Sequence, residues 1–180
     1  MFTCCEFEIN GYEVKLALPE VKYADKLYDI IAHDRAELAH FLPWAGKMSA
    51  VEDEVDFIRA MRNDFAQYRK LPLVILVNEQ PAGMVDLHTI KWNNESAEIG
   101  YWLSQAYQKK GIMTEAVRRL VAFSFNELGL HQVKLLADHN NLASRAIAER
   151  LNFTHVALLK DEVKYHGKFC DMDLYTMIKQ

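Results

Sequence analysis

The strongest constraint on the fold lies between residues 71 and 104, where three apolar stretches follow one another with only short polar links. The stretches read "LPLVILV", "AGMVDLHTI" and "AEIGYWLS", and they are rich in the β-branched and aromatic residues typical of strands. The links are "NEQP" and "KWNNES", in which Asn93 and Asn94 are typical turn residues. Links this short favour antiparallel neighbours, so the sequence predicts a three-stranded meander.

The apolar period changes after the third strand and predicts a helix over residues 113–128. One face of this helix carries Met113, Ala116, Val117, Leu120, Val121 and Ser124. Gly129 ends the helix, and "HQVKLLAD" then reads as another strand. Strand 97–104, helix 113–128 and strand 132–138 are therefore expected to form a right-handed crossover.

The remaining segments complete one α+β domain. A helical region in "IAHDRAELAHFLPW" ends at Pro43, and a second helix begins where Ser49 and Glu52 match a capping box. These two helices and their link are assigned to the first third of the chain. At the other end, a short helix in "NLASRAIAERLN" precedes a hairpin of "FTHVALLKDEV" and "KFCDMDLYTMI".

Composition narrows the functional classes. The chain has 180 residues and a formal net charge of −4, which argues against a nucleic-acid-binding protein. The longest apolar run, "LPLVILV", is too short to span a bilayer, and the N-terminus does not resemble a secretion signal. Three cysteines with one adjacent pair make a poor disulfide framework, and the seven histidines lack a metal-binding spacing. We expect a cytoplasmic protein without a membrane, nucleic-acid or metal partner.

The start of the predicted helix 113–128 is unusual. Gln108, Lys109, Lys110 and Gly111 precede it, and no Ser, Thr, Asp or Asn occupies the cap position. The free N–H groups of the first turn and two lysines favour an anion bound from outside. The alternative is a solvated loop with two surface lysines. The segment matches neither a P-loop nor a GxGxxG fingerprint.

The surrounding residues resemble the acyl-CoA-binding core of the GNAT N-acetyltransferase superfamily. The motif R/Q-x-x-G-x-G/A reads "QKKGIM" here, with Met113 replacing a small residue and narrowing the expected pyrophosphate cradle. "NNLASRAIAERLNF" resembles the second half of the site, with Asn152 in place of a glycine. "FLPWAGKMSAVEDEVDFI" and "YHGKFCDMDLY" are similar to the Rim-type (RimJ/RimL) ribosomal-protein N-acetyltransferases. The resemblance covers essentially the whole chain.

This resemblance implies a single GNAT domain over residues 1–180. Its twisted, mostly antiparallel sheet would have about seven strands and about four flanking helices. The strands at 97–103 and 132–138 would splay apart, and the pantetheine of acetyl-CoA would lie between them. The cofactor-binding residues implied are Tyr101, Trp102, Leu103, Gln108, Lys109, Lys110, Gly111, Ile112, Met113, Thr114, Asn141 and Ser144.

The implied reaction is direct attack of a primary amine on acetyl-CoA in a ternary complex, without a metal. The preferred acceptor is the N-terminal α-amine of a ribosomal or other protein. About one α-amine in ten is neutral at pH 7, against about one lysine amine in 2,500. The alternatives are a small-molecule acceptor such as an antibiotic or polyamine, or a non-catalytic acyl-CoA sensor. A homodimer is possible, because the closing hairpin could pair between chains.

The resemblance also suggests catalytic residues. Ser144 is assigned to return a proton to the thiolate, with Tyr107 and Tyr175 as weaker candidates. Glu162 is the first candidate for the general base. Glu98 is a further candidate.

Other assignments stay open. Asp161 could replace Glu162 as the base, and each carboxylate could instead be a solvated acid. Phe41, Leu42 and Trp44 could form a wall of the acceptor groove or pack in the core. "VEDEVD" could attract a basic peptide or form a solvated helix face.

Overall fold

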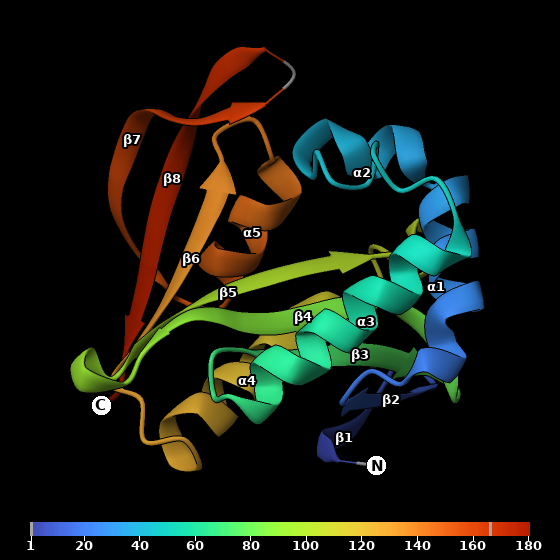
Figure 1. The fold of residues 1–180 in the computed structure, drawn as a ribbon. Helices are drawn as coiled ribbons and strands as arrows, with labels where there is room; N and C mark the ends of the chain where they lie inside the picture. Colours follow the sequence, from blue (N-terminus) through green and yellow to red (C-terminus); the bar gives the residue numbers. More distant parts are fainter. Residues whose placement is uncertain (1, 166) are drawn as a thin grey trace.

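The computed structural model describes residues 2–165 and 167–180, which form one mixed sheet with helices on both faces (Figure 1). The strands are β1 (Thr3–Ile9), β2 (Tyr12–Ala17), β3 (Leu71–Val77), β4 (Gln80–Lys91), β5 (Ser96–Leu103), β6 (Gln132–Asp138), β7 (Thr154–Tyr165) and β8 (Lys168–Ile178). The α-helices are α1 (Ala24–His33), α2 (Arg35–Phe41), α3 (Val51–Ala66), α4 (Ile112–Asn126) and α5 (Leu142–Arg150). The order in the sheet is β1-β2-β3-β4-β5-β6-β8-β7.

The predicted meander and crossover are confirmed. β3, β4 and β5 pair antiparallel in sequence order, whereas β5 and β6 are parallel and are joined through α4. The predicted apolar face of α4 is buried at all six of its positions. Helix α4 lies within one or two residues of its expected bounds, and Gly129 follows it with a left-handed φ of +69°.

The N-terminal hairpin β1–β2 was not predicted, and the assignment of only helices to the first third of the chain is wrong there. Asn10 and Gly11 form its turn with φ of +50° and +79°. Positive φ at both central residues is the geometry that an Asn-Gly hairpin turn favours. The structure also divides the first predicted helical region into α1 and α2. The described residues thus form eight strands and five α-helices, against about seven and about four expected.

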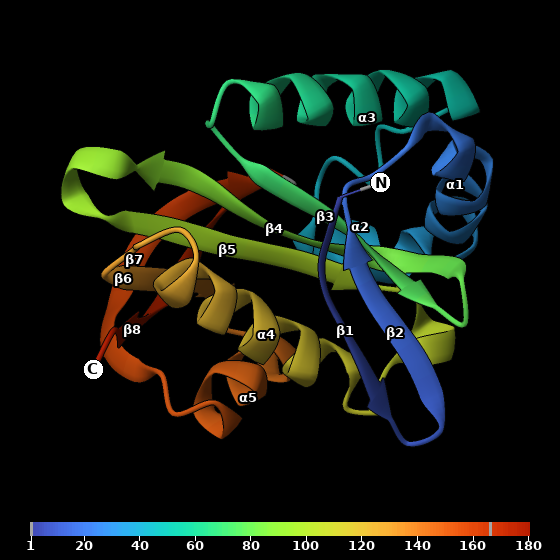
Figure 2. The same ribbon diagram turned by 90° about the horizontal axis from the view of Figure 1, so that it is seen from below.

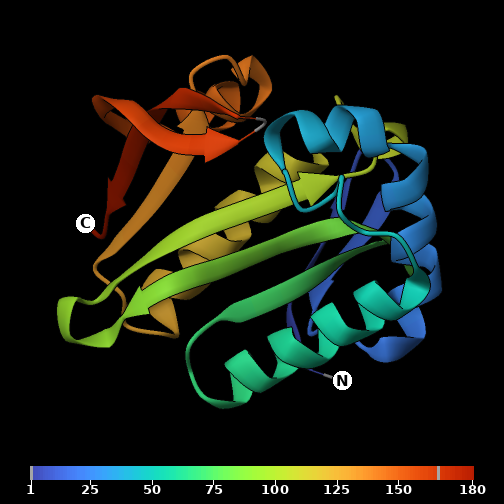
Figure 3. The same cartoon turned by 45° about the horizontal axis from the view of Figure 1, so that its top comes forward.

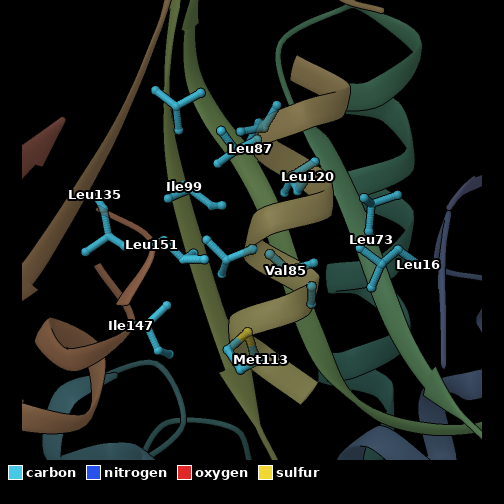
Figure 4. Packing of buried hydrophobic residues seen from close by; sticks show 14 of the residues in the cluster. Leu16, Leu73, Val85, Leu87, Ile99, Met113, Leu120, Leu135, Ile147 and Leu151 are labelled. Carbon is cyan, nitrogen blue, oxygen red and sulfur yellow. The ribbon is translucent and has the colours of Figure 1, made fainter. Parts of the chain in front are cut away.

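The sheet separates the core into two layers, and helices cover each of them (Figure 2). Helices α1, α2 and α3 cover one face, where Val74, Met84 and Trp102 belong to their buried cluster. Helices α4 and α5 lie on the other face, where Figure 4 shows Val85 and Leu120 packed together. Because helices cover both faces of β3, every residue of "LPLVILV" is buried.

The N-terminus of α3 is capped differently from the prediction. Asp53, not Glu52, closes the first turn, because its Oδ2 accepts bonds from the backbone N–H groups of Ser49 at 2.8 Å and Ala50 at 3.1 Å. The Ser49 hydroxyl also donates to this oxygen at 3.0 Å. These bonds hold the pKa of Asp53 below its usual value. The helix therefore begins one residue later than a cap at Ser49 implies.

Two further properties concern cysteines and membranes. Cys4, Cys5 and Cys170 are free thiols of intermediate exposure. Among residues 2–165 and 167–180, no helix combines the length and apolar character needed to cross a membrane.

Candidate active site

Strands β5 and β6 run side by side for four residue pairs and then separate. The last pair joins Ile99 to Leu135. Beyond it, β5 stays bonded to β4 as far as Leu103, and β6 stays bonded to β8 as far as Asp138. The sheet is thus divided into two continuous parts, visible in Figure 1, and the predicted splaying is confirmed beyond Ile99.

A cavity of about 820 Å³ occupies this split, a volume suited to a small-molecule ligand. Of the twelve residues predicted to bind a cofactor, eleven line it. They are Tyr101, Trp102, Leu103, Gln108, Lys109, Gly111, Ile112, Met113, Thr114, Asn141 and Ser144. Phe41 and Leu42 of the expected acceptor wall also line the cavity, whereas Trp44 is not among its lining residues.

The N-terminus of α4 faces this cavity without a side-chain cap. Its N-cap residue is Gly111, with a left-handed φ of +80°, and Lys109 is also left-handed at +60°. Residues Ile112, Met113 and Thr114 then present the N–H groups that no preceding helical turn can satisfy. The positive end of the helix dipole adds to these donors, so the geometry fits an anion such as the pyrophosphate of coenzyme A.

Side chains of the preceding loop anchor it to the scaffold. The Gln108 amide donates to the Leu103 carbonyl at 3.1 Å and to Glu37 of α2 at 3.0 Å. The Lys110 ammonium donates to the Tyr12 hydroxyl at 2.9 Å and lies over the Tyr12 ring at 5.0 Å. Lys110 is thereby directed toward hairpin β1–β2, and it does not line the cavity. Of Lys109 and Lys110, only Lys109 therefore supplies the positive charge expected beside the cavity.

A hydrogen-bonded pair links the two sides of the split. The Tyr101 hydroxyl of β5 lies 2.8 Å from the Ser144 Oγ of α5. Asn141 caps α5, because its Oδ1 accepts from the Ser144 N–H at 3.1 Å. Burial raises the pKa of Tyr101 to about 12, although the bond to Ser144 opposes this shift. Tyr101 therefore stays protonated at neutral pH and can act with Ser144 as a hydrogen-bond donor.

Comparison with known protein families identifies the family of this chain. The family described as "Acetyltransferase (GNAT) domain" matches residues 14–154, which is well over half of the chain. The chain belongs to the GNAT acetyltransferase family. Its reaction is accordingly acetyl transfer from acetyl-CoA, and the fold expected from the sequence resemblance is confirmed.

Three relatives illustrate this family. The chain is 30% identical to a Bacillus subtilis (strain 168) protein named "Putative ribosomal N-acetyltransferase YdaF", covering 100% of this chain and 97% of the relative. It is 25% identical to the ribosomal-protein-serine acetyltransferase of Escherichia coli (strain K12), over 84% and 85% of the two chains. The crystal structure of the Microcin C7 self-immunity acetyltransferase MccE with acetyl-CoA and AMP has a TM-score of 0.88, 28% identity and 92% coverage of each chain.

In this GNAT chain, helix α5 is held in place by a buried carboxylate on β8. Asp173 accepts from His139 at 2.9 Å and His155 at 2.7 Å, and Arg145 of α5 lies 3.2 Å away. Burial opposes ionisation of Asp173, but the two histidine bonds and the arginine charge outweigh it and hold its pKa below the usual value. This network fixes the helix turn that carries Ser144.

The carboxylates proposed as bases lie in different surroundings. Glu162 is exposed on β7, beside an irregularity in the pairing with β8, and it does not line the cavity. Asp161 has a φ of +53°, and its N–H donates to Asp171 at 3.0 Å. Glu98 of β5 lies on the opposite side of the split, where its Oε2 is 3.7 Å from the His88 Nε2. The geometry thus brings Glu98 next to another titratable side chain.

Sequence reasoning missed several residues of the GNAT cavity. Asp138, at the end of β6, lines it and accepts bonds from the Asn140 N–H at 2.8 Å and from the Tyr165 hydroxyl. Arg150 of α5 also lines it and donates to the Thr114 hydroxyl at 3.0 Å. Asn140 is a local partner of Asp138, but the other two pairings do not follow from spacing along the chain, since Tyr165 lies 27 residues from Asp138 and Arg150 lies 36 residues from Thr114. By contrast, Tyr107 lines the cavity as expected of a weaker candidate, whereas Tyr175 is buried in the core.

Among the described residues, no group of three or more His, Cys, Asp or Glu side chains is arranged to hold a metal ion. The family's chemistry needs none, because the acetyl group is already activated as a thioester.

Proposed function

We propose that this protein acetylates the N-terminal α-amine of a ribosomal or other protein, with residues 1–180 acting as one GNAT domain. The observation that carries the proposal is the split between β5 and β6, which opens beside the uncapped end of α4. This arrangement can hold a phosphate-bearing thioester by its two ends. Similarity over the full chain to a protein named for ribosomal acetylation supports a protein acceptor.

The chain's own residues divide the work as follows. The N–H groups of Ile112, Met113 and Thr114 bind pyrophosphate oxygens, and Gly111 lets the loop approach them closely. The exposed backbone of β5 beyond Ile99 pairs with the amides of pantetheine, as an added strand would. The Tyr101–Ser144 pair, which lines the cavity, gives a proton to the leaving sulfur.

An α-amine suits this site because it makes a small demand on a base. Its pKa of about 8 lies well below that of about 10.4 for lysine, so deprotonation costs less by about 3 kcal/mol. Two carboxylates that are each about a third exposed, Asp86 and Glu98, lie on the sheet face that also carries α3, and they favour a cationic acceptor.

Thiol release from acetyl-CoA with a matched peptide panel tests the function. We expect turnover with short peptides that carry a free N-terminal serine or alanine. We expect no turnover with the same peptides blocked at the N-terminus but containing an internal lysine. Turnover confined to blocked, lysine-containing peptides or to small amines would contradict the α-amine assignment. Binding of coenzyme A without any thiol release would favour a non-catalytic sensor.

A small-molecule amine with a planar ring is the second candidate acceptor. Trp44 and Phe57 lie nearly parallel, at an interplanar angle of 10° with ring centroids 6.5 Å apart, and both are more than a third exposed. Trp44 also contacts the cavity residue Trp102, with centroids 6.1 Å apart. Exposed aromatic rings bind planar groups well. The relative MccE was crystallised with both acetyl-CoA and AMP, which supports including aminoacyl nucleotides in the acceptor panel.

Replacing Ser144 by Ala is expected to lower kcat about tenfold, with little change in KM for acetyl-CoA. The effect is modest because a thiol of pKa about 8.5 leaves readily as a thiolate and needs little protonation. Tyr101→Phe removes the hydroxyl that lies 2.8 Å from Ser144 Oγ, so its loss should be similar and not additive with the first. Steady-state kinetics on both single variants and the double variant measure this coupling. Independent, additive losses would contradict a shared role.

A further inference from the structure

Three titratable side chains gather on the sheet face that carries α3. His88 of β4 lies directly opposite Glu98 of β5, and Asp86 precedes His88 by two residues and so shares its face. The His88 Nδ1 is 2.9 Å from Asp86 Oδ2, and its Nε2 is 3.7 Å from Glu98 Oε2. Each side chain keeps about a third of its surface exposed, at 34%, 28% and 34% for His88, Asp86 and Glu98.

Gly100 brings this cluster next to the acetyl-transfer cavity. A Cβ at Gly100 would lie 2.9 Å from Asp86 Oδ1 and 3.1 Å from His88 Cε1, so the pair packs directly on the glycine backbone. Gly100 also lines the cavity, just beyond the last β5–β6 pair at Ile99. Figure 3 shows β4 and β5 side by side, with α3 lying along the β3 side of the same sheet.

A strained bulge follows His88 immediately. The β4–β5 register is irregular between His88 and Lys91, and Thr89 has a left-handed φ of +49°. This conformation is costly for a β-branched residue, and Thr89 is exposed, so its own packing does not compensate for the strain. Bulges re-aim neighbouring side chains and are frequent beside active sites. The strain is consistent with a fixed orientation of the His88 imidazole.

We propose that His88 is the proton acceptor for the attacking amine, with Asp86 as its positioning residue. The Asp86 bond keeps the proton of neutral His88 on Nδ1, which leaves the Nε2 lone pair free. Glu98, beside Nε2, stabilises the imidazolium that forms and attracts the incoming ammonium group. This inference rests on the proposed function and identifies the base of the same site.

The proton balance is simple. The acceptor ammonium gives one proton to His88 Nε2, directly or through one water, and becomes a neutral amine. Its lone pair then forms the C–N bond as the C–S bond breaks, and the surplus N–H proton ends on the thiolate through Ser144. His88 finally returns its proton to solvent, so each turnover yields one amide, one thiol and one released proton.

The charges around His88 suit this role. The bond to Asp86 raises the pKa of His88 above its usual value, and the charges of Asp86 and Glu98 add to this effect. Burial and the charge of Lys70 oppose the shift. A base performs best when its pKa approaches that of the group it deprotonates, and an α-amine titrates near 8. We therefore expect kcat/KM to rise with pH. The titration of His88 should contribute to this rising limb of the pH profile.

The test compares His88→Gln and Asp86→Asn with the wild-type enzyme across pH 5.5–9, on the peptide that gives the fastest turnover. His88→Gln should lower kcat/KM on the order of 10²-fold at pH 7 and remove the His88 contribution from the pH profile. Asp86→Asn should lower kcat/KM less than His88→Gln does, and it should move the rising limb of the pH profile to lower pH. A purely structural role would not shift the limb. His33→Gln, at the exposed end of α1, is the matched histidine control and should behave as wild type.

Acetyl-CoA binding by calorimetry separates the possible failures. We expect both cluster variants to bind acetyl-CoA as tightly as the wild type, since neither residue lines the cavity. If His88→Gln keeps the wild-type rate and pH profile, or if Asp86→Asn leaves the limb unmoved, the proton-acceptor role is overturned while the proposed function stands. If the wild-type enzyme binds acetyl-CoA but acetylates no amine, the proposed function and the proton-acceptor role of His88 are both overturned.

Discussion

Coenzyme A is expected to bind the Gly111→Ala variant about a hundredfold more weakly than the wild-type protein. Gly111 has a φ of +80°, and an added Cβ would lie 2.9 Å from Ile9 Cδ1 of the neighbouring hairpin. The Ile9 side chain can move aside, but the left-handed φ strains alanine, and relaxation of that φ would reorient the N–H groups of the first turn of α4. Losing one or two charge-assisted bonds to pyrophosphate costs about 3 kcal/mol, which corresponds to a hundredfold change in Kd.

The other end of the same helix offers a matched control. Gly129 has a φ of +69°, and a Cβ there would meet nothing within 4 Å. Gly129→Ala should therefore cost about 1–2 kcal/mol of stability through backbone strain, as at Gly111, without changing coenzyme A affinity. Calorimetric titration of both variants, with their melting temperatures, gives the comparison. Equal affinity of Gly111→Ala and wild type would show that the helix end does not bind the pyrophosphate.

The parts of this fold that could be predicted are those that local sequence determines. The meander and α4 follow from apolar periods that span only a few residues. The turn at Asn152 was also foreseeable, because asparagine replaces glycine at low cost, and its φ is +61°. Hairpin β1–β2 has an equally local signal in its Asn10-Gly11 turn.

The parts that could not be predicted depend on strand register and on distant contacts. Asp86 and Glu98 meet through His88 only because β4 and β5 pair with one particular register. Lys110 was assigned to the phosphate site from its place in the motif, but Tyr12, 98 residues away, binds its ammonium group. Spacing along the chain contains no information about such partners.

Helix α3 contains the least expected carboxylate. The stretch "VEDEVD" was interpreted as a solvated or peptide-attracting face, yet Glu54 is 1% exposed. Neither of its carboxylate oxygens has a hydrogen-bond partner among the described residues. Desolvation raises the pKa of Glu54 to about 8. A buried, unpaired carboxylate is costly when ionised, so Glu54 is neutral in the folded protein at moderate pH.

Stability is therefore expected to fall as pH rises from about 5 to about 8. The folded state keeps the Glu54 proton up to a pKa of about 8, whereas the unfolded chain releases it near 4.5. The stabilisation is complete below the unfolded pKa and is lost as pH passes through the folded value. The total loss is on the order of 4 kcal/mol, so Glu54→Met should melt about 10 °C above the wild type at pH 8.5 and near it at pH 5.

Glu52→Gln provides the control, because Glu52 lies exposed in the same first turn of α3. Its melting temperature should follow the wild-type pH dependence with only a small constant offset. Glu54→Gln removes the ionisable proton while keeping the side-chain shape, and it should flatten the pH dependence as Glu54→Met does. If both Glu54 variants lose stability between pH 5 and 8.5 as steeply as the wild type, ionisation of Glu54 is not its cause. The pH-sensitive group would then lie elsewhere, and the interior around α3 would have to accommodate a charged carboxylate at little cost.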